Sequence, residues 1–164
     1  MVQPPLRDAD FRICRATMES TLMSFQWLQM RITEEQDRRQ REAQILARLP
    51  GVLDEVHRAL VLCVNDYVAA FGAESVEINC QGQKIRVTIR EEQEGKWEKL
   101  AKVEINTTPK LPGLHIDRNG EALDIEVGLL PGEKTSYKDG EEFLTMEEMT
   151  RRILDRSLFP KLGD

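Results

Sequence analysis

The segment Thr33-Glu-Glu-Gln-Asp-Arg-Arg-Gln-Arg-Glu42 contains no apolar residue and separates two segments that are apolar at helical spacing. Its charges are ordered, because Glu34, Glu35 and Asp37 each precede an arginine by four residues. An acidic side chain four residues before a basic one stabilises a solvated helix by about 0.3–0.5 kcal/mol per pair. The segment is therefore predicted to stay helical without a core beneath it, and such a helix is suited to contact another chain.

An apolar stripe continues on both sides of this charged segment, in steps of three and four residues that are typical of an amphipathic helix. The stripe consists of Phe11, Cys14, Met18, Leu22, Phe25, Leu28, Ile32, Ala43, Leu46 and Leu49. We expect one helix through Thr33, with the alternative that Thr33-Glu-Glu-Gln36 is a capping box at which a new helix begins.

A second helix is expected from Val52 to Phe71, with Gly72 after its end. Leu49-Pro50-Gly51 is predicted to end the first helix, because proline disfavours the α conformation of its predecessor and glycine favours a turn. Only this short connection separates the two helices. The sequence therefore predicts an antiparallel helical hairpin over residues 8–71.

After residue 74 the chain alternates apolar and polar residues, which is the period of half-buried strands. Two strands at 75–80 and 84–89 are expected to flank a turn at Gln81-Gly82, which pairs Ile78 with Ile85 and Val76 with Val87. A third strand is expected at 97–106, with Trp97, Ala101, Val103 and Ile105 on one face.

Asn119-Gly120 is the residue pair most typical of a two-residue hairpin turn. It predicts a second hairpin in which Ile116 faces Leu123, Leu114 faces Ile125 and His115 faces Asp124. A short sixth strand is expected at 135–137, before a turn at Asp139-Gly140. Thr145-Met-Glu-Glu148 has the capping-box pattern and predicts the start of a C-terminal helix.

Together these elements predict a single α+β domain over residues 1–164. It comprises the helical hairpin at 8–71, an antiparallel meander sheet of five or six strands at 74–144 and a C-terminal helix at 146–158. The helices are expected to cover one face of the sheet.

Composition excludes several classes of function. The net charge is −6, and the arginines near residue 40 alternate with acidic residues, so nucleic-acid binding is not expected. Cys14, Cys63 and Cys80 lack the spacing of a zinc or redox motif, which indicates reduced thiols. Without an apolar leader or a run long enough to span a bilayer, the expected location is cytoplasmic, with no membrane association.

Four residues on the outward face of the Asn119-Gly120 hairpin are candidates for chemistry: His115, Asp117, Asp124 and Glu126. An imidazole beside carboxylates suits a divalent metal or acid–base catalysis. A solvated polar face is the favoured interpretation, because no second histidine lies nearby in the sequence. No catalytic residue, metal or cofactor is therefore predicted.

The start of the N-terminal helix carries large apolar residues at several angles around its axis: Met18, Leu22, Phe25, Trp27 and Leu28. One explanation is a helix buried on two sides within its own domain. We favour the other, in which the second face contacts a partner, because aromatic and methionine residues are enriched at such contacts. The sequence thus favours a non-enzymatic protein that assembles as a homodimer through this helix, with the outer sheet face free for a protein partner.

The alternative is a small-molecule-binding domain or enzyme with a pocket between the helices and a curved sheet. Asp66 and Tyr67, within the otherwise apolar second helix, are its candidate residues. If Asp66 faced the sheet, it would need a partner or a role, because an unpaired buried carboxylate is costly.

Overall fold

A computed structural model describes residues 25–108 and 112–163 of the chain. The chain divides into two compact units, Met1–Gln40 and Arg41–Asp164. Helix α2 (Gln26–Phe71) contributes residues to both, and the second unit contains all the other elements. In chain order these are β1 (Val76–Gln81), β2 (Lys84–Gln93), β3 (Lys96–Thr108), β4 (Gly113–Arg118), β5 (Glu121–Leu130), β6 (Lys134–Asp139), β7 (Glu142–Leu144) and α3 (Met146–Leu158).

The N-terminal helical hairpin predicted over 8–71 is wrong, because α2 continues through Pro50 and Gly51. Among residues 25–108 and 112–163 only two helices occur, α2 and α3. A proline inside a helix costs about 3 kcal/mol or more. The residues on both sides of Pro50 belong to the core, because Leu49, Val52 and Leu53 are buried. Burying each such side chain contributes about 1.5–3 kcal/mol, which outweighs the cost of Pro50.

The helix is also continuous through Thr33, as expected. The hydroxyl of Thr33 donates to the carbonyl oxygen of Gln29 at 3.1 Å, four residues earlier in the same helix. A threonine within a helix forms this bond, whereas a capping threonine would accept from a backbone N–H ahead of it. Thr33 is therefore an interior residue of α2, and the alternative of a new helix at this position is excluded.

The strands form one antiparallel meander of seven strands in the order β1 to β7, so the expected five or six strands were too few. The additional strand is β7, which is three residues long and pairs Leu144 with Tyr137 across the turn after Asp139. A strand of this length is too short to show alternation in the sequence.

The two predicted hairpins differ in outcome. The register of β4 with β5 is confirmed, including Leu114 with Ile125, and Asn119 and Gly120 have φ of 54° and 92°, as a type I′ turn requires. In the first hairpin Ile78 faces Val87, not Ile85, so that predicted register is wrong by two residues. The two-residue loop is Gly82-Gln83. Gly82 has a φ of 59°, and the first position of such a turn requires a positive φ, which glycine adopts easily. A shift of two residues keeps every side chain on its expected face.

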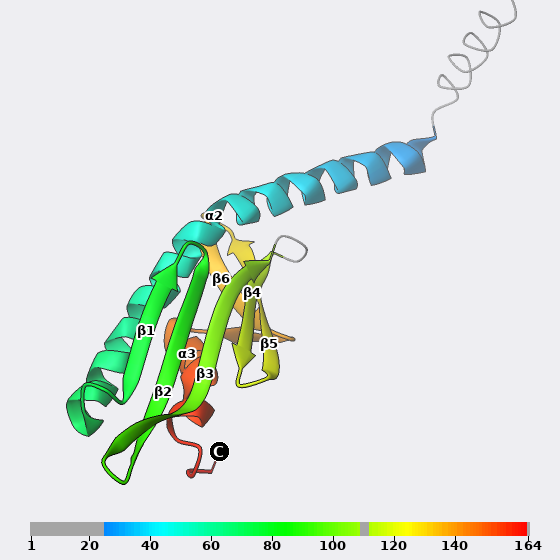
Figure 1. Cartoon of the computed structure of the whole chain (residues 1–164). Coiled ribbons are helices and arrows are strands. Elements are labelled where there is room, and N and C mark those ends of the chain that lie inside the picture. Colours follow the sequence, from blue (N-terminus) through cyan, green and yellow to red (C-terminus); the bar gives the residue numbers. More distant parts are fainter. Residues whose placement is uncertain (1–24, 109–111, 164) are drawn as a thin grey trace, which may run out of the picture. The chain divides into compact units, whose positions relative to one another are not determined.

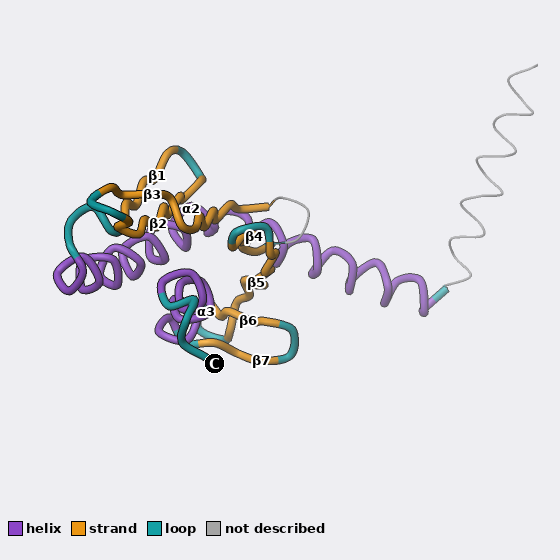
Figure 2. Tube along the Cα trace, turned by 60° about the horizontal axis from the view of Figure 1, so that its bottom comes forward, coloured by secondary structure: helices purple, strands orange, loops and turns teal. Residues whose placement is uncertain are grey.

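The sheet of the second unit is strongly curled (Figure 1), and α3 lies inside the curl, on the same side as the part of α2 after Gln40 (Figure 2). The interior is filled by apolar side chains from both helices and from the inward positions of the strands. Its fully buried members include Val56, Leu60, Ile85, Val87, Val103, Ile105, Ile116, Met149 and Ile153. No helix in the described part of the chain is both long enough and apolar enough to cross a bilayer.

Gly113 permits the close pairing of β4 with β5, because a Cβ atom there would overlap the backbone oxygen of Ile125. We expect Gly113→Ala to lower the free energy of unfolding by about 1–3 kcal/mol, as overpacking does. Gly51→Ala is the matched control, because a Cβ atom at this helical position meets nothing within 4 Å. It should raise stability by about 0.5–1 kcal/mol. Urea unfolding of both variants tests the pair, and equal effects would contradict the steric explanation.

Candidate functional site

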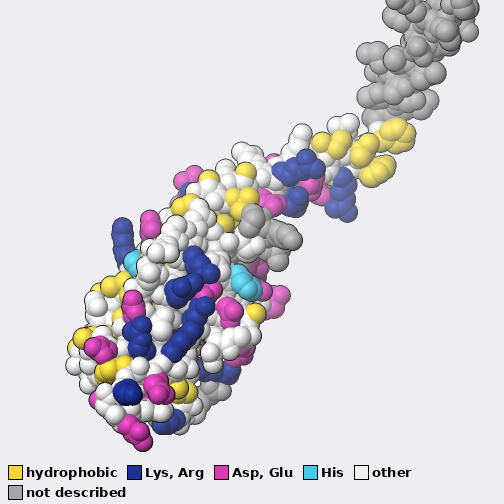
Figure 3. Space-filling model, viewed as in Figure 1, with side chains coloured by type: hydrophobic (Ala, Val, Ile, Leu, Met, Phe, Trp, Pro, Cys, Tyr) yellow, Lys and Arg dark blue, Asp and Glu magenta, His cyan; other side chains and the backbone are white. Residues whose placement is uncertain are grey.

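Phe25, directly before α2, and the first turns of α2 expose their apolar side chains. Phe25 is 55% exposed, Trp27 66% and Met30 60%, and they are joined by Leu28 and Ile32. Figure 3 shows apolar side chains gathered at this end of the described helix. Monomeric proteins rarely expose a large contiguous apolar patch, and such patches usually mark a contact surface. Of the residues predicted for the interface, Phe25, Trp27 and Leu28 are exposed, and Met18 and Leu22 lie outside the described residues.

The charged segment that follows is solvated, as its sequence indicates. Glu35 accepts hydrogen bonds from Arg38 and Arg39, each at 2.9 Å, and these two arginines lower the pKa of its carboxyl group to about 2. Glu34 instead pairs with Arg31, three residues before it, at 2.9 Å. Ion pairs within one helix therefore support α2 over this charged segment.

On the outer face of β4 and β5, His115 Nδ1 and Asp124 Oδ1 are 2.6 Å apart, in the predicted cross-strand pair. They border an open groove of about 460 Å³ together with Glu126, which faces Lys138 of β6. Asp117 does not line this groove. Its carboxylate instead accepts a hydrogen bond from the backbone N–H of Gly120 and stabilises the hairpin turn.

Both side chains of the His115–Asp124 pair are partly exposed, so solvent screens the carboxylate from the ring. Within the described ranges, no three histidine, cysteine, aspartate or glutamate side chains are placed to hold a metal ion. The arrangement is that of a solvated polar face with one cross-strand hydrogen bond, between His115 and Asp124.

Asp66 and Tyr67 lie beside a surface groove of about 500 Å³ between α2 and α3. The hydroxyl of Tyr67 donates to the carbonyl oxygen of Leu158 at 3.4 Å, and its ring packs on Phe71 and Phe159. Burial, and then the charge of Glu91, raise the pKa of Tyr67. Asp66 is exposed at the rim and does not face the sheet, where apolar core side chains fill the space.

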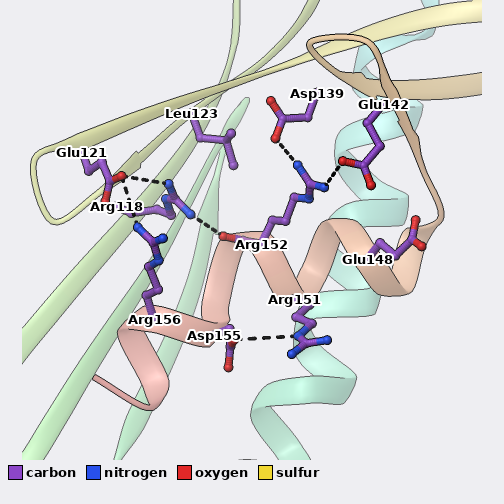
Figure 4. Close-up of a pocket in the computed structure, with 10 residues that line it drawn as sticks. All are labelled: Arg118, Glu121, Leu123, Asp139, Glu142, Glu148, Arg151, Arg152, Asp155 and Arg156. Carbon is purple, nitrogen blue, oxygen red and sulfur yellow. Dashed lines mark hydrogen bonds and ion pairs between the residues drawn. The ribbon is translucent and has the colours of Figure 1, made fainter. Parts of the chain in front are cut away.

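A charged hollow of about 570 Å³ was missed by the sequence analysis (Figure 4). It lies between α3 and the turns of the β4–β5 and β6–β7 hairpins. Arg152 of α3 reaches both strands of the β6–β7 hairpin. It donates hydrogen bonds to Asp139 of β6 and, at 2.5 Å, to Glu142 of β7. These two carboxylates, Glu142 first, raise the pKa of Arg152.

Arg118, at the end of β4, connects the other hairpin to α3. One Nη donates to the carbonyl oxygen of Arg152 at 2.7 Å, and the other lies 3.5 Å from Glu121. Its Nε is buried without a hydrogen-bond partner among the described residues. Arg156 and Arg151 are also paired, with Glu121 and Asp155. Each arginine that lines the hollow lies within 4 Å of a carboxylate, and Arg152 and Arg118 join α3 to the two hairpins.

A second network that the sequence did not reveal lies on the outer face of β2 and β3. Glu104 is bonded by Lys102, by Lys84 at 2.9 Å and by Arg86 at 3.3 Å. Lys102, and then Lys84, lower the pKa of this carboxyl group to about 2. Figure 3 shows the basic side chains gathered over this face of the sheet.

No family model matches this chain, and neither a curated protein nor a solved structure matches it. Its function is therefore inferred from the residues and their geometry alone.

Arg152→Met removes both ion pairs between α3 and the β6–β7 hairpin while keeping an apolar stem of similar length. We expect it to lower the free energy of unfolding by about 1–2 kcal/mol, since the pairs are only partly screened by solvent. Arg151→Met is the matched control, because Arg151 is exposed and its pair with Asp155 spans 3.8 Å. Its effect should stay within about 0.5 kcal/mol. Denaturant unfolding compares the two, and equal losses would refute the joining role of Arg152.

Glu104→Gln should lower the free energy of unfolding at neutral pH. This difference from the wild-type protein should disappear in acid. The pKa of Glu104 is about 2 in the folded protein and 4.5 ordinarily, so ionised Glu104 stabilises the fold above pH 4.5. That contribution disappears as the pH falls toward 2 and the carboxyl group takes up a proton. Urea unfolding of both proteins from about pH 7 to about pH 2.5 tests this, with Glu98→Gln on the same strand as control. A difference that does not depend on pH would contradict it.

Proposed function

We propose that this protein is a non-enzymatic assembly protein that forms a homodimer through the first turns of α2. The observation that carries the proposal is the exposure of Phe25, Trp27, Leu28, Met30 and Ile32 within two helical turns. Aromatic and methionine side chains are the types enriched at the centres of protein interfaces. A continuous helix holds them rigidly, which reduces the entropy lost on binding.

The energetics support an interface of this size. Burying each large apolar side chain contributes about 1.5–3 kcal/mol. These residues are 40–66% exposed, so burying the accessible part of all five on two copies contributes a free energy similar to the roughly 4–15 kcal/mol that association costs in lost freedom of motion. The core of the second unit is built from other residues and does not use these side chains.

The remaining surfaces suit a supporting role. The polar outer face of the sheet is proposed as a surface for a further protein partner, and Cys63 and Cys80 occur as free thiols, which is compatible with a proposed cytoplasmic location. The alternative of a small-molecule site has less support, because Asp66 is exposed and the space between helices and sheet holds core side chains.

Phe25→Glu combined with Trp27→Glu should convert a dimer into a folded monomer, because each copy would then bring two desolvated charges to the interface. Sedimentation velocity across a hundredfold range of concentration measures the association, and circular dichroism verifies the fold. Leu62→Glu is the matched control, since Leu62 is a large side chain of the same helix, 68% exposed, outside the proposed contact. It should leave the dimer intact. A wild-type monomer, or a dimer that survives the double substitution, would overturn the proposal.

A further inference from the structure

The ion-pair network on the outer face of β2 and β3 contains more positive than negative charge. Nitrogen atoms of Lys84, Arg86 and Lys102 all lie within 3.3 Å of the carboxylate of Glu104. Three cations that share one carboxylate leave a net charge of +2, although the whole chain has a net charge of −6. These four residues form a basic cluster, and a local excess of positive charge attracts anions.

The cations of the basic cluster are accessible from solvent. The side chain of Glu104 is 15% exposed, whereas that of Arg86, directly opposite on the neighbouring strand, is 51% exposed. Figure 3 shows basic side chains as a stripe over this face of the sheet. Lys102, and then Lys84, lower the pKa of Glu104 to about 2, so its carboxylate stays charged at neutral pH. The excess of positive charge is therefore constant there.

Glu104 does not satisfy all the hydrogen-bond donors of the cluster. Two lysines and one arginine carry about eleven N–H donors, whereas a carboxylate accepts about four hydrogen bonds. Like charges at neighbouring positions of a sheet are also unfavourable. A further carboxylate would accept some of the remaining donors and reduce the repulsion among the cations. Because the shared carboxylate already holds the three side chains, binding would cost little additional side-chain entropy.

Acidic residues border the cluster and limit the size of its ligand. Asp117 of β4 lies opposite Glu104 across the strand pair, and Glu77 of β1 lies opposite Thr88, the neighbour of Lys102. The positive region therefore covers little more than two strands. A nucleic acid binds through a long series of phosphates, which these bordering carboxylates and the net charge of −6 would repel. A short peptide with two or three acidic side chains matches both the extent and the charge of the cluster.

We infer that the basic cluster binds an acidic peptide segment of a partner protein, whose carboxylates contact Lys84, Arg86 and Lys102. The inference rests on the further partner proposed above for the outer sheet face and specifies the chemistry of that partner. It does not depend on the proposed dimer, because the cluster lies wholly within the second unit and the exposed apolar residues of α2 lie in the first. Complementary charge of this kind contributes mainly to specificity and to the rate of association.

Fluorescence anisotropy with a labelled hexaglutamate peptide tests the inference, in about 50 mM salt because higher salt screens surface charges. The wild-type protein should bind this peptide and not labelled hexaglutamine. Lys84→Gln combined with Arg86→Gln should weaken binding roughly tenfold or more, since two of the three contacts are lost. Lys96→Gln combined with Lys99→Gln is the matched control, because it makes the same change in net charge at exposed positions of β3 outside the cluster. It should change the dissociation constant by less than about twofold. No binding of hexaglutamate, or equal weakening by both pairs, would refute the inference.

Further measurements separate this inference from the other possibilities. Circular dichroism verifies that the variants are folded, which is expected because Lys102 still pairs with Glu104. Tighter binding of hexathymidylate than of hexaglutamate would assign the cluster to nucleic acid and refute the peptide partner. The variant with Phe25→Glu and Trp27→Glu should bind hexaglutamate as the wild type does. A wild-type dimer that does not bind the peptide refutes only this inference, and a wild-type monomer that binds it refutes only the proposed dimer.

Discussion

Burial of the concave face of the sheet against α2 and α3 is the constraint on which the rest of the second unit depends. Most inward apolar residues of β2, β3 and β4 are buried, as are Leu60 of α2 and Ile153 of α3. To surround α3, the sheet must curl, and this curvature brings β6 and β7 round to the same helix (Figure 2). The same burial keeps Pro50 within a continuous α2, because ending the helix there would remove Leu49 or Val52 from the core.

Ion pairs fix the geometry that the apolar core creates. Arg152 and Arg118 both reach from one element to another across the edge of the curl, and each is held by groups that lie far from it in the sequence. Charge pairs of this kind add specificity of arrangement more than stability, since removing both charges from water is costly. Carboxylates line the hollow at α3 beside its four arginines, so it is better understood as a structural junction than as an anion site.

The two units differ in how completely their apolar side chains are buried and their charged side chains are paired within the unit. In the second unit, apolar side chains fill a core, and Glu104 and Arg152 each have partners of opposite charge. In the described part of the first, Phe25 and Trp27 are exposed, and Glu35 pairs with arginines of its own helix. Unsatisfied apolar surface beside an ordered pattern of charge is what an assembly helix presents, which favours α2 as the element that carries the proposed function.

The sequence by itself determined what depends on neighbouring residues. Asn119-Gly120 set both the turn and the register of β4 with β5, Thr145 and Glu148 form the capping box at the start of α3, and His115 faces Asp124 as alternation requires. The exposed character of Phe25, Trp27 and Leu28 was also predictable, because their angles around the helix exceed what one face can bury. Only the tertiary structure decided that Pro50 remains helical, that β7 exists and that Arg152 joins Asp139 to Glu142. These features depend on burial and on pairing between distant segments, which the curl of the sheet creates and which no local pattern encodes.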